Sequence, residues 1–228
     1  MTNKTRAPQK LWYEDACGAA HALELLGERW ALLVVRELMF GARRFSELRD
    51  GLPGISANIL TQRLEGLEAA QIVVRRQLPS PVNAQVYELT PWGYETEPIF
   101  QTLGRWASRS PSHDPTMPLS AASLMLSFRT MLDGKRTKGL DLKVGLRVGD
   151  DTFVARLEDG ELTIHRSELR GEQDVDVTIA GEATAIASVV YGGRSLGDAR
   201  ADGAIEVDGN RAVAKSFVAL FKLPPKAA

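Results

Sequence analysis

The stretch that decides the fold is SANILTQRLEGLEAAQIVVRRQ, residues 56–77. At about 100° per residue, Leu60, Leu64 and Leu67 fall on one side of a helix. The other side carries amide, hydroxyl and carboxylate side chains: Asn58, Thr61, Gln62 and Glu65. A helix that is merely solvated prefers a mixture of lysine and glutamate there. The pattern then changes into a strand-like run that ends in two arginines, so this segment predicts a helix with a specialised polar face followed by a strand.

The residues before this stretch predict three more helices. Residues 17–40 carry a helical apolar stripe and read as two helices, the second of which can end at Gly41 in a left-handed conformation. Residues 43–52 predict a short third helix. The sequence LPGIS then forms a turn, in which Ser56 can cap the polar-faced helix.

The residues after this stretch predict a β-hairpin and another helix. IVVRRQ (72–77) and QVYELT (85–90) read as strands, and the loop between them contains two prolines. Thr90 and Pro91 are typical of a helix start. That helix should reach residue 108 with a kink at Pro98, because proline removes one backbone hydrogen bond.

Two helices, a turn, a polar-faced helix and a hairpin together predict a winged helix-turn-helix. The DNA major groove admits one helix, and Asn, Gln, Ser, Thr and Arg side chains read its base edges. Residues 43–76 also carry six arginines against four acidic residues, and arginines can meet phosphates. The predicted DNA-contacting residues are Arg43, Arg44, Ser56, Asn58, Thr61, Gln62, Arg63, Arg75 and Arg76.

A second domain follows a proline-rich segment. Residues 109–118 contain three prolines and no apolar periodicity, which is typical of a linker. We place the domains at 1–110 and 119–228, with the linker at 111–118. Twelve of the twenty glycines lie from Gly134 onward, where alternating patterns predict a meander of antiparallel strands and then helices around a short strand. Residues 119–133 fit both patterns, and we favour a helix.

The fold class is therefore α+β, with an N-terminal winged helix-turn-helix and a C-terminal α/β domain whose largely antiparallel sheet is covered by helices. We expect direct contact between the domains, with part of the strand-rich face against residues 94–108. The kinked helix there would then lie beside the second domain.

The bulk composition excludes several classes of function. The 228 residues carry a net charge of −1, and no apolar run approaches the length of about 20 residues that a membrane span needs. The first eighteen residues have no apolar signal-peptide core. The one cysteine and three dispersed histidines fit neither a disulfide nor a metal site. We expect a cytoplasmic protein that uses no cofactor and, since no catalytic constellation stands out, is not an enzyme.

Residues 14–108 resemble the HxlR family of bacterial transcription regulators. The resemblance rests on LLGERWALLVVREL, RRFSELR, LPGIS, LTQRLEGLE and YELTPWG, and on the position of Cys17. It implies a dimeric winged helix that binds DNA and dimerises through the first and last helices of the domain. Residues 80–85, at the wing tip, lack the basic residue that many wings carry, which puts a strong minor-groove contact in doubt. Some members sense oxidants or electrophiles through a cysteine here. Cys17 is thus a candidate thiol sensor, and a small apolar residue in the dimer interface is the alternative.

Residues 119–224 resemble sterol-carrier-protein type 2 domains, most strongly in VTIAGEATAIASVVYGGRSLGDARADGAIEVDGNRAVAKSFVALFKLP. This resemblance implies helices over a sheet and often an apolar tunnel for acyl chains or other hydrophobic ligands. The candidate tunnel residues are Ile186, Val189, Val190, Phe217, Leu220 and Phe221. The same residues could equally form plain core, and plain core is the more frequent role of such side chains.

Two functions compete at this point. The first is a homodimeric transcription regulator that binds double-stranded DNA at an inverted-repeat operator. Its second domain would bind a hydrophobic small-molecule effector or stabilise the dimer. The alternative is a carrier of lipids or other hydrophobes whose winged helix contacts proteins. The Asn/Gln/Arg face favours the regulator, because a protein-binding winged helix has no need of it. Neither function requires a membrane.

Overall fold

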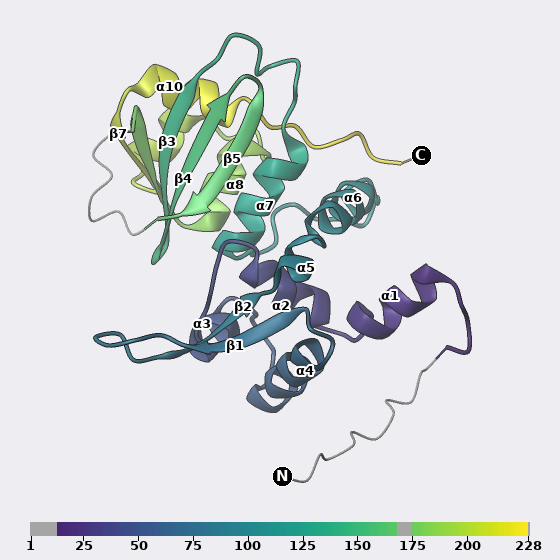
Figure 1. The fold of residues 1–228 in the computed structure, drawn as a ribbon. Helices are drawn as coiled ribbons and strands as arrows, with labels where there is room; N and C mark the ends of the chain where they lie inside the picture. The colour runs from purple at the N-terminus through teal and green to yellow at the C-terminus, as the bar shows by residue number, and fades with distance from the viewer. Residues whose placement is uncertain (1–12, 168–174, 228) are drawn as a thin grey trace.

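The computed structural model describes residues 13–167 and 175–227, and its two halves lie one above the other (Figure 1). Residues 1–12, which open the predicted first domain, lie outside the described part. The first half contains α1 (Gly18–Leu26), α2 (Ala31–Leu38), α3 (Phe45–Asp50), α4 (Ala57–Ala69), β1 (Val73–Gln77), β2 (Gln85–Leu89), α5 (Pro91–Tyr94) and α6 (Glu97–Ala107). This order confirms the winged helix-turn-helix predicted from the sequence.

The helix starts follow the predicted capping residues. The Ser56 hydroxyl accepts a hydrogen bond from the Ile59 amide at 3.3 Å and so caps α4. The Thr90 hydroxyl caps α5 in the same way, from the Gly93 amide at 3.0 Å. Gly54 adopts φ +91°, which the turn before α4 requires. Leu60, Leu64 and Leu67 are buried, so α4 presents its opposite face to solvent.

The predicted kink at Pro98 is instead a break between two helices. α5 ends at Tyr94 and α6 begins at Glu97, with Pro98 in the first turn of α6. Proline is tolerated there because the first amides of a helix have no partner within it. The prediction of one kinked helix was therefore wrong, although its outer boundaries hold.

The second half is a five-stranded sheet with helices. It contains α7 (Ala121–Met131), β3 (Leu142–Val148), β4 (Asp151–Glu158), β5 (Glu161–Arg166), β6 (Val177–Gly181), α8 (Ala183–Val190), α9 (Leu196–Ala201), β7 (Ile205–Gly209) and α10 (Arg211–Val218). The strand order is β5-β4-β3-β6-β7. The meander of β3, β4 and β5 is antiparallel as predicted, but β6 pairs with β3 in parallel.

The core of the second half centres on α7, the segment that the sequence left ambiguous. The Phe128 ring is fully buried and stacks on Phe221, with centroids 4.4 Å apart. Phe217 meets Phe128 edge-on at 5.7 Å. α7 also contacts α6, and it lies between α6 and the sheet (Figure 1). α7 therefore contributes both to the hydrophobic core of the second half and to the contact with the first half.

The wing is the hairpin of β1 and β2. Near its base, two arginines and one aspartate join the halves. The Arg43 guanidinium lies 2.5 Å from an Asp151 carboxylate oxygen, and Arg166 of β5 pairs with the other oxygen of the same carboxylate. Arg43 also exchanges two backbone hydrogen bonds with Tyr87 of β2. Beside this ion pair, the Phe40 ring meets Phe153 of β4 edge-on at 5.6 Å. The base of the wing is thus tied to the sheet through Arg43.

A second set of contacts joins the halves along α7. The Ser120 hydroxyl caps α7 and donates to the buried Glu37 carboxylate at 2.7 Å. Arg129 of α7 donates to both carboxylate oxygens of Glu97, at 2.8 and 2.9 Å. The direct contact expected between the domains is present. The expected partner was wrong, however: α6 packs on α7, whereas the sheet meets Phe40 and Arg43 in the segment between α2 and α3.

The aspartate between the two arginines should contribute to folding. We predict that Asp151→Asn lowers the free energy of unfolding by about 1–3 kcal/mol, less than for a fully buried pair because both guanidinium groups keep some solvent contact. The measurement is denaturant unfolding at one protein concentration. The neighbouring Asp150→Asn, on an exposed side chain, is the control and should stay within about 0.5 kcal/mol of the parent. Equal effects of the two changes would contradict the ion-pair account.

Candidate nucleic-acid interface

The outer face of α4 presents the predicted base-reading residues together. Asn58, Thr61 and Gln62 are exposed, and Ser56 stands exposed at the start of the same helix. The buried leucines on the opposite side fix the rotation of α4. Amide and hydroxyl groups on a rigid, exposed helix can both donate to and accept from base edges. The geometry therefore places the predicted base-reading side chains on the solvent-facing side of a single helix.

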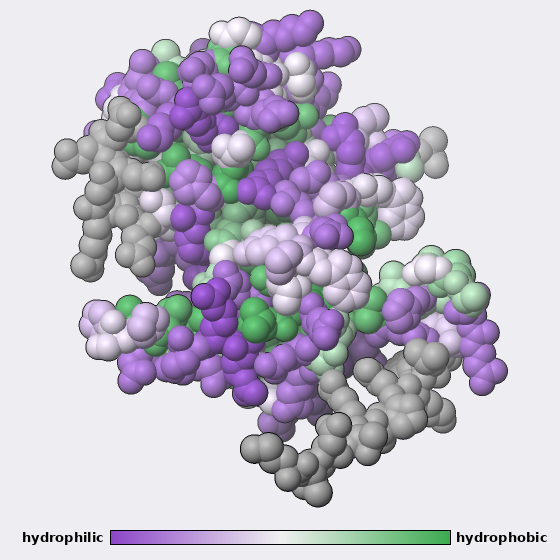
Figure 2. All heavy atoms as spheres, viewed as in Figure 1, coloured by the Kyte–Doolittle hydropathy of each residue, from purple (hydrophilic) through white to green (hydrophobic). Residues whose placement is uncertain are grey.

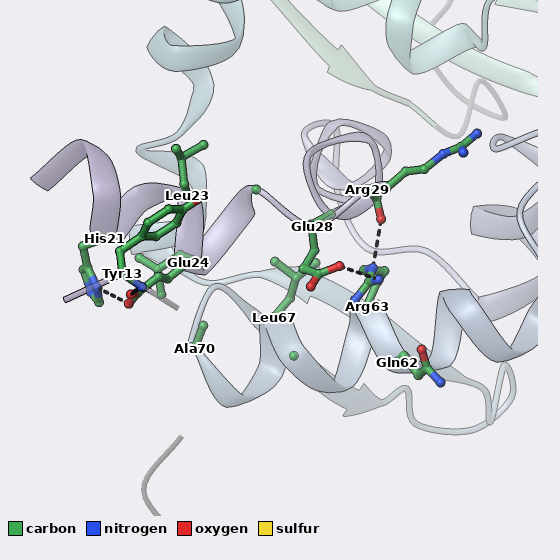
Figure 3. Close-up of a pocket in the computed structure, with 14 residues that line it drawn as sticks. Tyr13, His21, Leu23, Glu24, Glu28, Arg29, Gln62, Arg63, Leu67 and Ala70 are labelled. Carbon is green, nitrogen blue, oxygen red and sulfur yellow. Dashed lines mark hydrogen bonds and ion pairs between the residues drawn. The ribbon is translucent and has the colours of Figure 1, made fainter. Parts of the chain in front are cut away.

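Arg63, also predicted as a DNA contact, is engaged inside the first half. Its Nε donates to the Arg29 carbonyl at 2.9 Å, and its Nη2 lies 2.8 Å from a Glu28 carboxylate oxygen (Figure 3). Its side chain is 19% exposed. In the same view Gln62, one residue earlier, lies away from this ion pair. Arg63 thus fixes α4 to the turn before α2, a role that its position on the flank of the helix could not reveal.

Arg43 is likewise held by protein groups, since its side chain is 13% exposed and paired with Asp151. The three other predicted phosphate contacts lie at the surface. Arg44 is exposed at the start of α3. Arg75 and Arg76 on β1 are 52% and 60% exposed, beside Glu68 and Glu88 respectively. Their long side chains can leave these exposed pairs at little cost, since surface ion pairs contribute about 0–1 kcal/mol.

A hollow of about 430 Å³ separates α1 from α4 (Figure 3). On its α1 side the Glu24 carboxylate accepts a hydrogen bond from the Tyr13 amide at 3.0 Å and lies 3.3 Å from the His21 ring. Gln62 and Arg63 line its α4 side. α1 projects away from the body of the protein (Figure 1). The sequence indicated neither the hollow nor the role of Glu24.

Hydrophobic side chains are exposed on the first and last helices of this half. Ile99, Leu103 and Trp106 of α6 are 49%, 44% and 71% exposed, and α6 has no buried residue at all. Leu23 of α1 is 54% exposed. Figure 2 shows hydrophobic atoms at the surface around α6 and α1 on a mainly hydrophilic face. Such a patch is typical of a protein–protein contact.

Cys17 is exposed and occupies the N-cap position of α1. The backbone amides of Ala20 and Ala19 at the open end of the helix favour the thiolate, and they lower the pKa of the Cys17 thiol from its ordinary value. A lowered pKa increases the fraction of thiolate, which is the nucleophilic form of a cysteine.

The predicted tunnel residues lie in the hydrophobic core or pack against it. Phe217 and Phe221 meet edge-on at 5.2 Å, and Ile186 and Leu220 are each 1% exposed. Four surface hollows found in the described part of the chain are lined by other residues. This packing favours the alternative of plain core for these side chains, and their role toward a ligand stays a prediction.

Comparisons with known proteins separate the two halves. Residues 25–114 match the HxlR-like helix-turn-helix family, and residues 110–227 match the alkyl sulfatase C-terminal family. The HTH-type transcriptional regulator YodB of Bacillus subtilis is 39% identical over 88 residues, which span 39% of this chain and 79% of YodB. The chain belongs to the HxlR-like helix-turn-helix family. Its second half belongs to the alkyl sulfatase C-terminal family, and the likeness to sterol carriers stays a prediction.

Two solved structures are also similar to parts of the chain. The reduced form of YodB from B. subtilis shares 36% identity, covers 43% of this chain and 98% of its own, and has a TM-score of 0.39. The sec-alkylsulfatase Pisa1 from Pseudomonas sp. shares 20% identity, covers 44% of this chain and 16% of its own, and has a TM-score of 0.39. Within residues 13–167 and 175–227 no helix has the length and hydropathy that crossing a membrane requires. The same residues contain no group of three or more His, Cys, Asp or Glu side chains arranged to hold a metal ion.

The position of Cys17 leads to a pH-dependent prediction. Alkylation by iodoacetamide, which requires the thiolate, should follow an apparent pKa below the value of about 8.5 for an unperturbed cysteine. The measurement is the alkylation rate against pH. The same chain unfolded in urea is the control, because it has one cysteine and no helix to favour the thiolate. If native and unfolded protein give one superimposable profile, α1 has no influence on the thiol.

Proposed function

We propose that the protein is a homodimeric transcription regulator that binds an inverted-repeat operator in double-stranded DNA. The observation that carries the proposal is the exposed Asn58, Thr61 and Gln62 face on α4, set on a helix whose other side is buried. Family membership supports the DNA-binding class. A regulator of bacterial transcription acts beside the chromosome, so we place it in the cytoplasm.

The residues divide by role. Ser56, Asn58, Thr61 and Gln62 contact base edges, and Arg44, Arg75 and Arg76 contact phosphates. Arg43 and Arg63 act differently from what the sequence indicated. Through Asp151 and Glu28, they hold the wing and α4 in the orientation that the other residues need. Phosphate contacts supply affinity and register, whereas base contacts supply specificity.

The second copy of the chain covers the exposed hydrophobic side chains of α1 and α6. A two-fold axis there brings the same patch of both protomers together, as a closed dimer requires. The two α4 helices then enter successive major grooves about 34 Å apart, and the half-sites lie about 10 base pairs apart.

Two inputs can modulate this regulator. A hydrophobic small molecule bound by the second domain would act through the contacts that join it to the wing and to α6. An electrophile that reacts with Cys17 would act at the start of α1, inside the proposed dimer surface. The second input requires that Cys17→Ser abolish oxidant-induced loss of operator binding. If neither input exists, the second domain serves to stabilise the dimer.

Gln62 tests the assignment of α4. Gln62→Ala should weaken operator binding by about 1–3 kcal/mol and relax the preference at one base position in each half-site. The measurement is a binding titration on genomic fragments selected by the protein, followed by footprinting. Lys215→Ala, on the exposed face of α10, is the matched control and should leave affinity unchanged.

An absence of any protected inverted repeat would end the regulator proposal. It would favour a carrier protein whose winged helix contacts proteins. If Gln62→Ala weakened binding to specific and nonspecific DNA equally, Gln62 would not be a base contact.

Leu103 tests the dimer surface. Leu103→Asp should shift the protein toward the monomer, because a carboxylate would be buried without a partner between two α6 helices. Sedimentation over a range of concentrations measures this shift. Val82→Asp makes a similar change at the wing tip, where Val82 is 51% exposed, and should stay dimeric. A Leu103→Asp protein that dimerises like its parent would place the dimer interface elsewhere.

A further inference from the structure

A cleft of about 430 Å³ lies where the linker, α6 and α7 meet. Arg36 of α2 and Phe100 of α6 line it from the first half, and Leu126 of α7 and Tyr191 line it from the second. Met117 of the linker, 63% exposed, stands beside it. Its volume falls in the range of about 300–1,000 Å³ that is typical of small-molecule sites. A molecule in this cleft would touch both halves of the protein at once.

The C-terminal tail helps to close the cleft. Leu223 is part of its wall. Three residues further on, the Lys226 ammonium donates to the carbonyl oxygens of Ser108, Ser110 and His113, at 3.3, 3.0 and 2.8 Å. These bonds hold the tail against the end of α6, so the wall of the cleft is fixed by specific contacts.

The polar groups of the cleft define what it can bind. The Ser127 hydroxyl donates its one proton to the Leu124 carbonyl at 2.7 Å. In the 2.9 Å contact between Ser127 and Tyr191, the tyrosine must therefore be the donor. Burial raises the pKa of the Tyr191 phenol well above its usual range, so it stays protonated. Its oxygen retains lone pairs that can accept one more hydrogen bond.

The cleft is lined by one cation and one carboxylate, Arg36 and Asp114. The Arg36 guanidinium is committed to Glu37, with Nε and Nη2 at 2.9 and 2.7 Å from one carboxylate oxygen. Asp114, which also lines the cleft, adds a negative charge. An ionised carboxylate would bring only acceptors to a site that offers an acceptor. A ligand that hydrogen-bonds to the Tyr191 oxygen must therefore bring its own proton, as a hydroxyl group does and an ionised carboxylate does not.

We propose that this cleft, between the two halves and outside the core of the second domain, is the effector site, and that it takes a neutral hydrophobic molecule bearing a hydroxyl group, such as an alkyl alcohol. The apolar body lies against Phe100, Leu126 and Met117, and the hydroxyl donates to the Tyr191 oxygen. The regulatory effect of such a ligand rests on the proposed operator binding. Binding of the ligand to the cleft does not. A bound alcohol would couple to DNA by stabilising one packing of α6 on α7 over another, an effect that is typically 5- to 150-fold in affinity.

The test is calorimetric titration of the full-length protein, without DNA, with 1-octanol. We expect saturable binding, and octanoate at neutral pH should bind at least about 10-fold more weakly because it carries no proton to donate. Tyr191→Phe should weaken octanol binding by about 3- to 10-fold, the effect of one hydrogen bond.

A blocking variant locates the site independently of the tyrosine. Gly104 lines the cleft from α6, and a Cβ atom at this position would meet nothing within 4 Å, so Gly104→Leu should fold and fill the space. It should reduce octanol binding by more than about 10-fold. Gly134→Leu adds the same side chain at another open position that does not line the cleft, and it should bind as the parent does.

Each outcome decides a separate point. An absence of saturable octanol binding, or binding that Gly104→Leu leaves intact, would overturn the site. Octanoate binding as tight as octanol would overturn the hydroxyl assignment. A third outcome is that the variants change octanol binding as expected while octanol leaves operator affinity unchanged. That result would establish the binding site and overturn its role as an effector site. If no operator exists, the titration still decides the binding site, so failure of the regulator proposal is distinguishable.

Discussion

The Asp151 carboxylate pairs with both Arg43 and Arg166, and the orientation of the two halves relative to each other depends on this interaction. Arg43 is paired through its backbone with Tyr87 of the wing, so the ion pair fixes the wing and not only a loop. Partly buried ion pairs contribute little net stability compared with apolar packing, but they disfavour other arrangements in which a charge would be left unpaired. The Phe40–Phe153 contact beside it supplies the apolar part of the junction. The wing thus has a defined orientation relative to the second sheet.

α6 connects this junction to the proposed dimer. One side of the helix packs on α7, where Arg129 binds Glu97, while Ile99, Leu103 and Trp106 remain exposed. The Lys226 ammonium lies at its C-terminal end, where a cation complements the helix dipole. A change in the second domain can therefore reach the dimer surface through a single helix. The cleft beside Tyr191 lies at this place, so in the proposed dimer a ligand there would act on the spacing of the two α4 helices.

The sequence predicted what depends on local patterns. The leucine period of α4, the Ser56 and Thr90 caps and the alternation of β3 to β5 involve neighbouring residues, and the structure confirms them. Contacts between distant residues were not predictable. Nothing around Arg43 or Arg63 in the sequence indicates Asp151 or Glu28, and the parallel pairing of β6 with β3 depends on how the chain crosses the sheet. The cleft was missed for the same reason, because segments from across the chain surround it.

The two families in this chain form one body, in which the second domain is held to the base of the wing through Arg43 and packs on α6. Scanning calorimetry of the full-length protein at fixed concentration tests this arrangement. We expect a single cooperative transition, because the junction couples the unfolding of the two halves. Two separated transitions, one of which matches an isolated winged-helix fragment, would contradict it and would leave the second domain a tethered neighbour of the regulator.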